Sequence, residues 1–205
     1  MTEVAPAGEA PTKGPLIAYL RQAFADEKAR AGVLLQLYFR VMSEKLWQVS
    51  LPGFPEGSFR DFVRLFDSPH TVLGIDPETK KYIGLGTLFD VVGLVPRRRA
   101  SVSYCFFRDF WGTKELRECA RRTISVWFKD AGLSVIYGAG LKRNGIARSF
   151  AKNFGFEESS VLPKFFPDLP GDSGDAVMLH LTSERWAEWL ASQEVPEAEK
   201  PLAVM

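Results

Sequence analysis

The hydrophobic pattern is clearest between residues 99 and 156, where strand-like and helix-like periods alternate. Over residues 100–107, larger apolar residues alternate with mostly small polar ones, which predicts a strand with two unlike faces. A turn containing Gly112 follows, and apolar positions then repeat at helical spacing with basic residues between them. These positions are Leu116, Cys119, Ala120, Thr123, Ile124, Trp127 and Phe128. The pattern predicts a central strand, a glycine turn and an amphipathic helix.

A second strand and a second helix are expected directly after the first pair. Residues 133–141 are apolar and strand-like, and Asn144 begins a short segment with apolar residues on one helical face. Gly155 lies where the end of a helix favours a left-handed residue, and Phe156 can pack back on the preceding turn. Amides at a helix start lack intrahelical acceptors and attract anions. The Gly112 turn is therefore a candidate seat for a phosphate or pyrophosphate.

The flanking segments predict further elements of the same domain. Residues 16–49 are mostly helix-forming, although residues 16–24 fit a first strand equally well, and both interpretations stay open. Ser58 is expected to cap a short helix. Strands are expected over residues 71–75, 82–92 and 175–181, and a loop over residues 52–57. A final helix is expected to bear Trp186 and Trp189 and to be capped by Thr182 or Ser183.

Composition indicates one globular domain. The chain has 205 residues, 46% of them hydrophobic and 25% charged, and a net charge of +1, which gives no global attraction for nucleic acid. We expect a single domain over residues 15–194 between flexible tails at 1–14 and 195–205. The two cysteines form no disulfide framework or metal cluster with the two histidines. Without a signal-like or membrane-spanning apolar run, a cytoplasmic location is expected.

From about residue 82 to 181 the chain resembles a GNAT-superfamily N-acetyltransferase, most closely the subgroup that acetylates ribosomal-protein N-termini. The turn at 110–112, with Glu118 further into the helix, resembles the pyrophosphate loop of that subgroup. Asn144, eleven residues before Gly155, fits the spacing of the family. The order of strands and helices agrees as well.

The resemblance implies an α/β fold with a mixed, mostly antiparallel sheet flanked by helices. It also implies transfer of an acetyl group from acetyl-CoA, as co-substrate, to a primary amine by direct attack. Acetyl-CoA would lie in a V between the strands at 100–107 and 133–141. No metal is implied. The residues implied to bind acetyl-CoA are Phe106, Phe107, Arg108, Trp111, Gly112, Thr113, Lys114, Glu115 and Asn144.

Within that set, different groups are expected to hold different parts of the co-substrate. Backbone groups near Phe106 and Arg108 would pair with the pantetheine amides. The loop amides from Gly112 to Glu115 would hold the pyrophosphate, and the Asn144 side chain would bind near the pantetheine arm.

The chain departs from the family pattern at three positions. Lys114 stands where a second loop glycine is usual, so the pyrophosphate loop is degenerate: lysine adds a cation that favours phosphate, but it also adds a side chain and restricts the backbone. Ala151 replaces the usual tyrosine acid, and Ala147 replaces the serine of the subgroup. No catalytic acid transfers by motif. Tyr104 and Ser149 are the remaining candidates, each against a packing role.

Two rivals to an active enzyme stay open at this level. The chain could be a GNAT-fold module that binds acyl-CoA or a protein partner without turnover. It could also be an interaction protein that uses the aromatic helix at 34–47 or the Trp186 helix. The acceptor would be a small-molecule amine or a protein N-terminus, with no nucleic acid or membrane partner, and a homodimer is an open alternative. His70 and His180 are more simply explained as structural residues.

Overall fold

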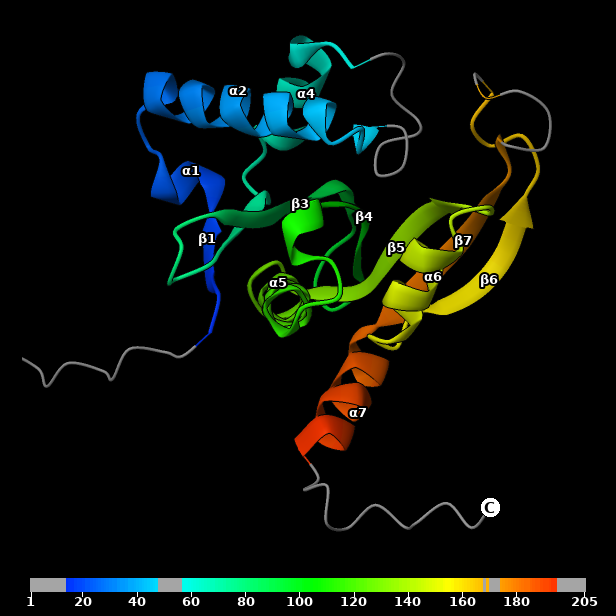
Figure 1. Ribbon diagram of the computed structural model, residues 1–205. Coiled ribbons are helices and arrows are strands. Elements are labelled where there is room, and N and C mark those ends of the chain that lie inside the picture. The colour runs from blue at the N-terminus through cyan, green and yellow to red at the C-terminus, as the bar shows by residue number, and fades with distance from the viewer. Residues whose placement is uncertain (1–13, 48–56, 168, 170–173, 195–205) are drawn as a thin grey trace, which may run out of the picture.

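The strands join in one seven-stranded sheet with the order β1-β2-β3-β4-β5-β7-β6 (Figure 1). The structure is a computed structural model that describes residues 14–47, 57–167, 169 and 174–194. Every neighbouring pair of strands is antiparallel except β4 and β5, which are parallel. The strands are β1 (Leu16–Tyr19), β2 (Val72–Ile75), β3 (Tyr82–Val92), β4 (Arg98–Phe106), β5 (Leu133–Leu141), β6 (Glu157–Leu162) and β7 (Ala176–Thr182). The expected mixed, mostly antiparallel α/β fold is confirmed.

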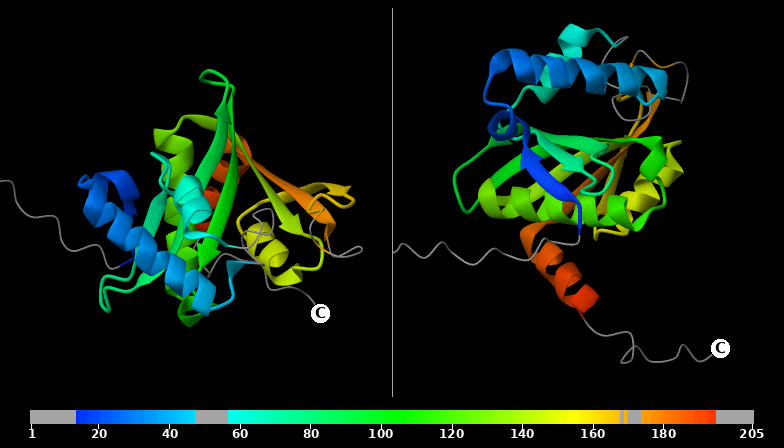
Figure 2. Two further views of the ribbon diagram at one scale, coloured as in Figure 1. Left: turned by 90° about the horizontal axis from the view of Figure 1, so that it is seen from above. Right: turned by 60° about the vertical axis from the view of Figure 1, so that its left-hand side comes forward.

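Helices cover both faces of the sheet. The helices are α1 (Leu20–Ala23), α2 (Glu27–Ser43), α4 (Phe59–Phe66), α5 (Lys114–Asp130), α6 (Gly145–Lys152) and α7 (Ser183–Glu194), with a 3₁₀ helix at Arg108–Phe110. Helices α2 and α4 lie on one side, which we call the α2 face, and α5 and α6 lie on the other, the α5 face (Figure 2). No helix in the described ranges is both long and apolar enough to span a membrane.

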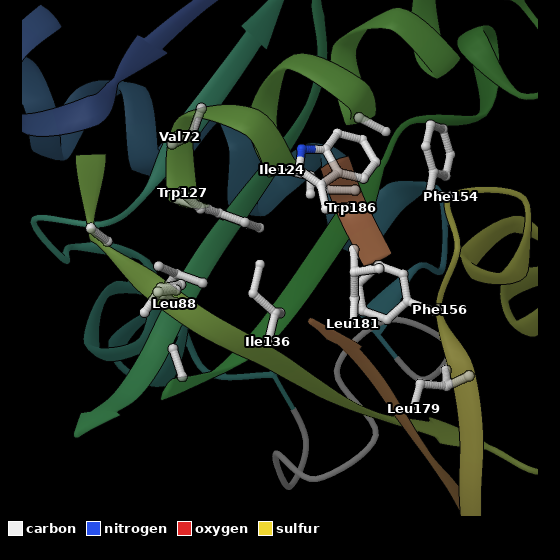
Figure 3. Close-up of a cluster of buried hydrophobic side chains, with 14 residues drawn as sticks. Val72, Leu88, Ile124, Trp127, Ile136, Phe154, Phe156, Leu179, Leu181 and Trp186 are labelled. Atoms are coloured by element: carbon white, nitrogen blue, oxygen red, sulfur yellow. The ribbon is translucent and has the colours of Figure 1, made fainter. Parts of the chain in front are cut away.

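Each face of the sheet has its own core. On the α2 face, Leu37 of α2 and Phe62 of α4 pack with Phe107, and all three side chains are buried. On the α5 face, Trp127 of α5 and Trp186 of α7 pack in a second cluster against the sheet (Figure 3). Successive strand residues point to opposite faces. In β4 the even-numbered residues from Ala100 to Phe106 therefore join the α5 face, and Cys105 joins the α2 face.

Side-chain caps begin the helices where the sequence predicts them. Ser58 Oγ accepts from the Asp61 amide at 3.1 Å and caps α4. At α7, Thr182 Oγ1 accepts from the Arg185 amide at 3.2 Å, so Thr182 is the cap. Each cap satisfies an amide that the helix itself leaves without an acceptor.

Two segments differ from a simple interpretation of the pattern. The stretch at 16–24 contains a strand as well as a helix, so both interpretations are partly correct. Strand β1 runs directly into the short helix α1 at the buried Leu20. Strand β6 was not predicted, because most of its residues are exposed and polar. Of the predicted tails at 1–14 and 195–205, all residues except Gly14 lie outside the described residues, as does most of the loop at 52–57. The single-domain boundaries stay a prediction.

Candidate active site

A cavity of about 460 Å³ opens where β4 and β5 diverge. The last described pair between these parallel strands is Ser101 with Tyr137. Beyond that pair β4 and β5 no longer pair with each other, and Val102 and Tyr104 of β4 and Gly138 of β5 line the cavity. The V between two strands, which the resemblance implied at 100–107 and 133–141, is therefore present.

The walls of the cavity are mostly apolar and come from both helices on the α5 face. Arg108 and Arg148 are the charged side chains that line it, and no carboxylate or imidazole does so in the described residues. Those residues also contain no cluster of groups able to hold a metal ion. The apolar lining includes Leu116, Ala120 and Ile124 of α5, Ile146, Ala147, Phe150 and Ala151 of α6, and Phe154, Phe156 and Leu179. Such a lining suits an uncharged chain rather than an ion.

The N-terminus of α5 lies at the rim of this cavity. Thr113 caps the helix, because its Oγ1 accepts from the Leu116 amide at 3.2 Å and donates to the Phe110 carbonyl at 2.8 Å. Gly112 lines the cavity with φ of +80°, which glycine adopts without strain. The first-turn amides of Lys114 and Glu115 have no intrahelical acceptor. The turn therefore presents two amide donors and the positive helix end beside the cavity.

Lys114 does not obstruct this site. Its side chain is 93% exposed, and Nζ lies 3.9 Å from Glu115 Oε1. Thr113, Lys114 and Glu115 do not contribute to the cavity wall. These residues are expected to act through their main-chain amides. Lys114 therefore adds an exposed cation beside the loop and does not fill the cavity.

Asn144 has a structural partner as well as a place in the cavity wall. Its Oδ1 accepts from the Ala147 amide at 3.1 Å and caps α6, while the residue lines the cavity. Ser149 lies on α6 but not in the lining. Asn144 can therefore offer a ligand its amide nitrogen while its oxygen holds the helix.

Some of the backbone groups expected to bind pantetheine already form hydrogen bonds within the protein. The Arg108 amide donates to Glu44 Oε2 at 2.7 Å, and the Phe106 carbonyl accepts from Trp111 Nε1 at 2.9 Å. The Arg108 guanidinium lies 4.8 Å from the Trp111 ring centre. Phe107 is fully buried on the α2 face, away from the cavity.

The remaining main-chain edge of β4 faces the opening. The Phe107 amide donates to the Ile83 carbonyl, and main-chain groups alternate in direction along a strand. Those of Val102 and Tyr104 therefore point away from β3, toward the side where β5 diverges.

Tyr104 contributes its ring to the cavity but not its hydroxyl. The ring lies 5.2 Å from that of Trp127 and stacks on Phe106 at 5.5 Å. The hydroxyl is buried and has no hydrogen-bond partner in the described parts of the chain. Burial raises the pKa of Tyr104 well above its usual value of 10, so the phenol stays protonated at neutral pH. It can therefore serve there as a proton donor and not as a phenolate base.

A family model for the GNAT acetyltransferase domain matches residues 36–157, more than half of the chain. The chain belongs to the GNAT acetyltransferase family. A sequence search of curated proteins found no match.

Solved structures of GNAT enzymes share the fold. Spermidine N-acetyltransferase from Vibrio cholerae, with CoA and spermine, is 19% identical with a TM-score of 0.63, over 76% of this chain and 93% of that one. Mycobacterium smegmatis RimJ with CoA-disulfide is 13% identical with a TM-score of 0.62, over 80% and 85%. Ribosomal-protein-S5-alanine acetyltransferase from Vibrio fischeri is 16% identical with a TM-score of 0.60, over 76% and 91%. At these identities the likeness shows a shared fold.

Several cavity residues of this GNAT domain were not identified from the sequence. Ile124 and Phe154 were assigned only to apolar helix faces, and Ser103, Ala139 and Leu179 had no assigned role. Their place in the lining depends on where β5 leaves β4 and on the pairing of β7 with β5. No local sequence signal carries that information.

Proposed function

We propose that this GNAT domain transfers an acetyl group from acetyl-CoA to a primary amine by direct attack of the amine on the thioester. The observation that carries the proposal is the cavity between the diverging strands β4 and β5, with the N-terminus of α5 at its rim. An apolar channel suits the pantetheine arm and the acetyl group, and the helix start suits the pyrophosphate.

The cavity supports catalysis by positioning. A channel lined by both strands would align the thioester, and strand amides facing the opening at Val102 and Tyr104 would polarise its carbonyl. In this proposal Trp111, Arg108 and Asn144 act from the wall, whereas Gly112 to Glu115 act through the loop amides. Alignment of the reactants can supply much of the rate without a strong acid.

A second candidate is a module that binds acyl-CoA or a protein partner with little turnover. It is favoured by the cavity lining, which within the described residues contains no carboxylate or imidazole, and by the buried hydroxyl of Tyr104. Both candidates require acyl-CoA or a partner to bind. They differ in whether an amine is consumed.

Calorimetric titration with acetyl-CoA tests the binding that both the acetyltransferase and an acyl-CoA-binding module require. We expect micromolar binding that Asn144→Ala weakens; no binding at millimolar acetyl-CoA would exclude the acetyltransferase proposal. Mass spectrometry of mixtures with spermidine, an alanine-initiated peptide and a lysine peptide then separates the candidates, because only an active enzyme adds an acetyl group. Sedimentation of the same sample tests the homodimer that the sequence leaves open.

A further inference from the structure

The cavity between β4 and β5 runs from an exposed rim to a buried inner end. At the rim, Trp111 and Ile146 are 42% and 76% exposed. At the other end the lining reaches Ile124 and Phe154, which are 2% and 4% exposed. Both of these residues belong to the buried cluster on the α5 face (Figure 3). The cavity therefore enters the core of the domain.

The cavity follows helix α5 inward from its N-terminus. Leu116, Ala120 and Ile124 line it at intervals of four residues, so they share one side of the helix. At about 1.5 Å of rise per residue, these positions span about 12 Å. Val102 of β4 packs against the buried cluster that contains Ile124, and Val102 and Tyr104 supply the strand amides proposed to polarise the thioester carbonyl. An acyl group on that thioester would therefore lie at the inner end of the cavity.

Small residues keep the inner part of the cavity open. Ala120 of α5, Gly138 of β5 and Ala151 of α6 line it from three elements. Ala151 also stands where a tyrosine is usual in the family, so the volume of a ring is left open. Protein interiors contain few voids larger than a water molecule, and an apolar cavity holds water poorly. A cavity of about 460 Å³ that reaches the core therefore favours an apolar ligand.

The inner lining offers no charge to a ligand. Arg148 lines the cavity, but its Nε lies 2.8 Å from Glu158 Oε1. Arg108 lies against the Trp111 ring at the rim, and its Nε donates to the Glu44 carbonyl at 2.9 Å. Both guanidinium groups are thus engaged within the protein, which favours an acyl chain that ends in a methyl group over one that ends in a carboxylate. The lining residues that are buried are all apolar, namely Leu116, Ala120, Ile124, Phe154, Phe156 and Leu179.

We propose that the preferred donor of this domain is an acyl-CoA with a straight hydrocarbon chain longer than acetyl, and that the chain lies between Ala151 and Ile124. This inference rests on the proposed transfer to an amine and names the class of donor. The bonds that change are the same for every chain length. The amine nitrogen forms a bond to the acyl carbon, the C–S bond breaks, and one amine proton ends on the sulfur of CoA.

Calorimetric titration of the wild-type protein with CoA, acetyl-CoA, butyryl-CoA and succinyl-CoA tests the inference. Each buried methylene tightens binding about fourfold, so the Kd for butyryl-CoA should be about 15-fold below that for acetyl-CoA. Succinyl-CoA has as many acyl carbons as butyryl-CoA but ends in a carboxylate, and it should bind more weakly than butyryl-CoA. A butyryl-CoA Kd no lower than about one third of the acetyl-CoA Kd, or tighter binding of succinyl-CoA, would overturn the inference.

The variant Ala151→Phe tests whether the gain arises in the inner part of the cavity. A ring at this position would occupy the space for the chain, so the ratio of the acetyl-CoA Kd to the butyryl-CoA Kd should fall from about 15 to about 1. Ala31→Phe, at an exposed position of α2, is the matched control and should keep the wild-type ratio. An unchanged ratio in folded Ala151→Phe would contradict the inference.

The titration of the wild-type protein decides the inference by itself if Ala151→Phe does not fold. It also separates the inference from the proposed function. No binding of CoA or of any acyl-CoA at millimolar concentration would remove the proposed function, and the inference with it. Binding of CoA and acetyl-CoA without a gain for butyryl-CoA would remove the inference alone.

Discussion

Where β4 and β5 diverge, the two faces of the sheet differ in how far apart their residues lie in the sequence. On the α5 face, apart from Leu179, the cavity lining comes from one stretch between residues 102 and 156. On the α2 face, register alone brings residues of five strands side by side, namely Phe89, Ser101, Tyr137, His180 and Glu157. The comparison teaches that the lining of the proposed co-substrate cavity is encoded locally, whereas the neighbours on the α2 face depend on the assembled sheet.

The strongest test of the α5 side fills its cavity. A Cβ at Gly138 would lie 3.6 Å from Val102 Cγ1, so Gly138→Phe would place a ring in the opening between the strands. We expect the Kd for acetyl-CoA to rise at least about 100-fold, a loss of about 2.7 kcal/mol, since the ring occupies the proposed channel. Calorimetry measures it.

Gly32→Phe is the matched control, because Gly32 lies on the exposed side of α2 with open space around it. Equal affinity in Gly138→Phe and wild type, with both folded by circular dichroism, would mean that the cavity is not the co-substrate site.

A smaller effect is expected at Asn144, where capping and ligand binding overlap. Asn144→Ala should weaken acetyl-CoA binding about tenfold and lower Tm, because it removes both the cap of α6 and an amide donor. Asn144→Asp keeps an oxygen for the Ala147 amide but has no donor. It should restore Tm and not affinity, as measured by calorimetry and thermal melts. Full recovery of affinity would reduce the role of Asn144 to capping.

The variant Tyr104→Phe tests whether the Tyr104 hydroxyl on the α5 face acts as a catalytic acid. The hydroxyl has no partner to lose, so we expect kcat to change by less than about threefold and Tm to stay equal or rise. Because the pKa of Tyr104 is raised above 10, its proton cannot explain a fall in rate between pH 8 and about 10. A hundredfold loss of kcat at constant KM would identify Tyr104 as the missing acid.

The smallest effect is expected at Lys114. Its side chain points into solvent, so Lys114→Gly should change the Kd for acetyl-CoA by about twofold or less, as one screened charge is lost. Titrations at low and high salt measure this. A sharp gain in affinity would instead mean that lysine restricts the loop, and the native chain would then be a weak binder.

The contiguous part of the fold is predictable because its signals are local. Strand β5 has the predicted bounds, 133–141, and α5 follows the Gly112 turn as its period and turn chemistry require. Strand β6 is an edge strand with mostly exposed residues, so it lacks the apolar alternation that marks strands. His180 could be placed in a strand, but its partners Tyr137 and Glu157 depend on long-range register that no local pattern specifies.

The alternation of residues along β4 and β5 has a consequence for how the family diversifies. Val102 and Gly138 line the cavity from the α5 face, while their direct neighbours Ser101 and Tyr137 face the α2 side. A substitution at either neighbour can therefore change the open face without changing the wall of the cavity. Under the proposed function, selection could retune acceptor preference one residue at a time while the donor site is inherited intact.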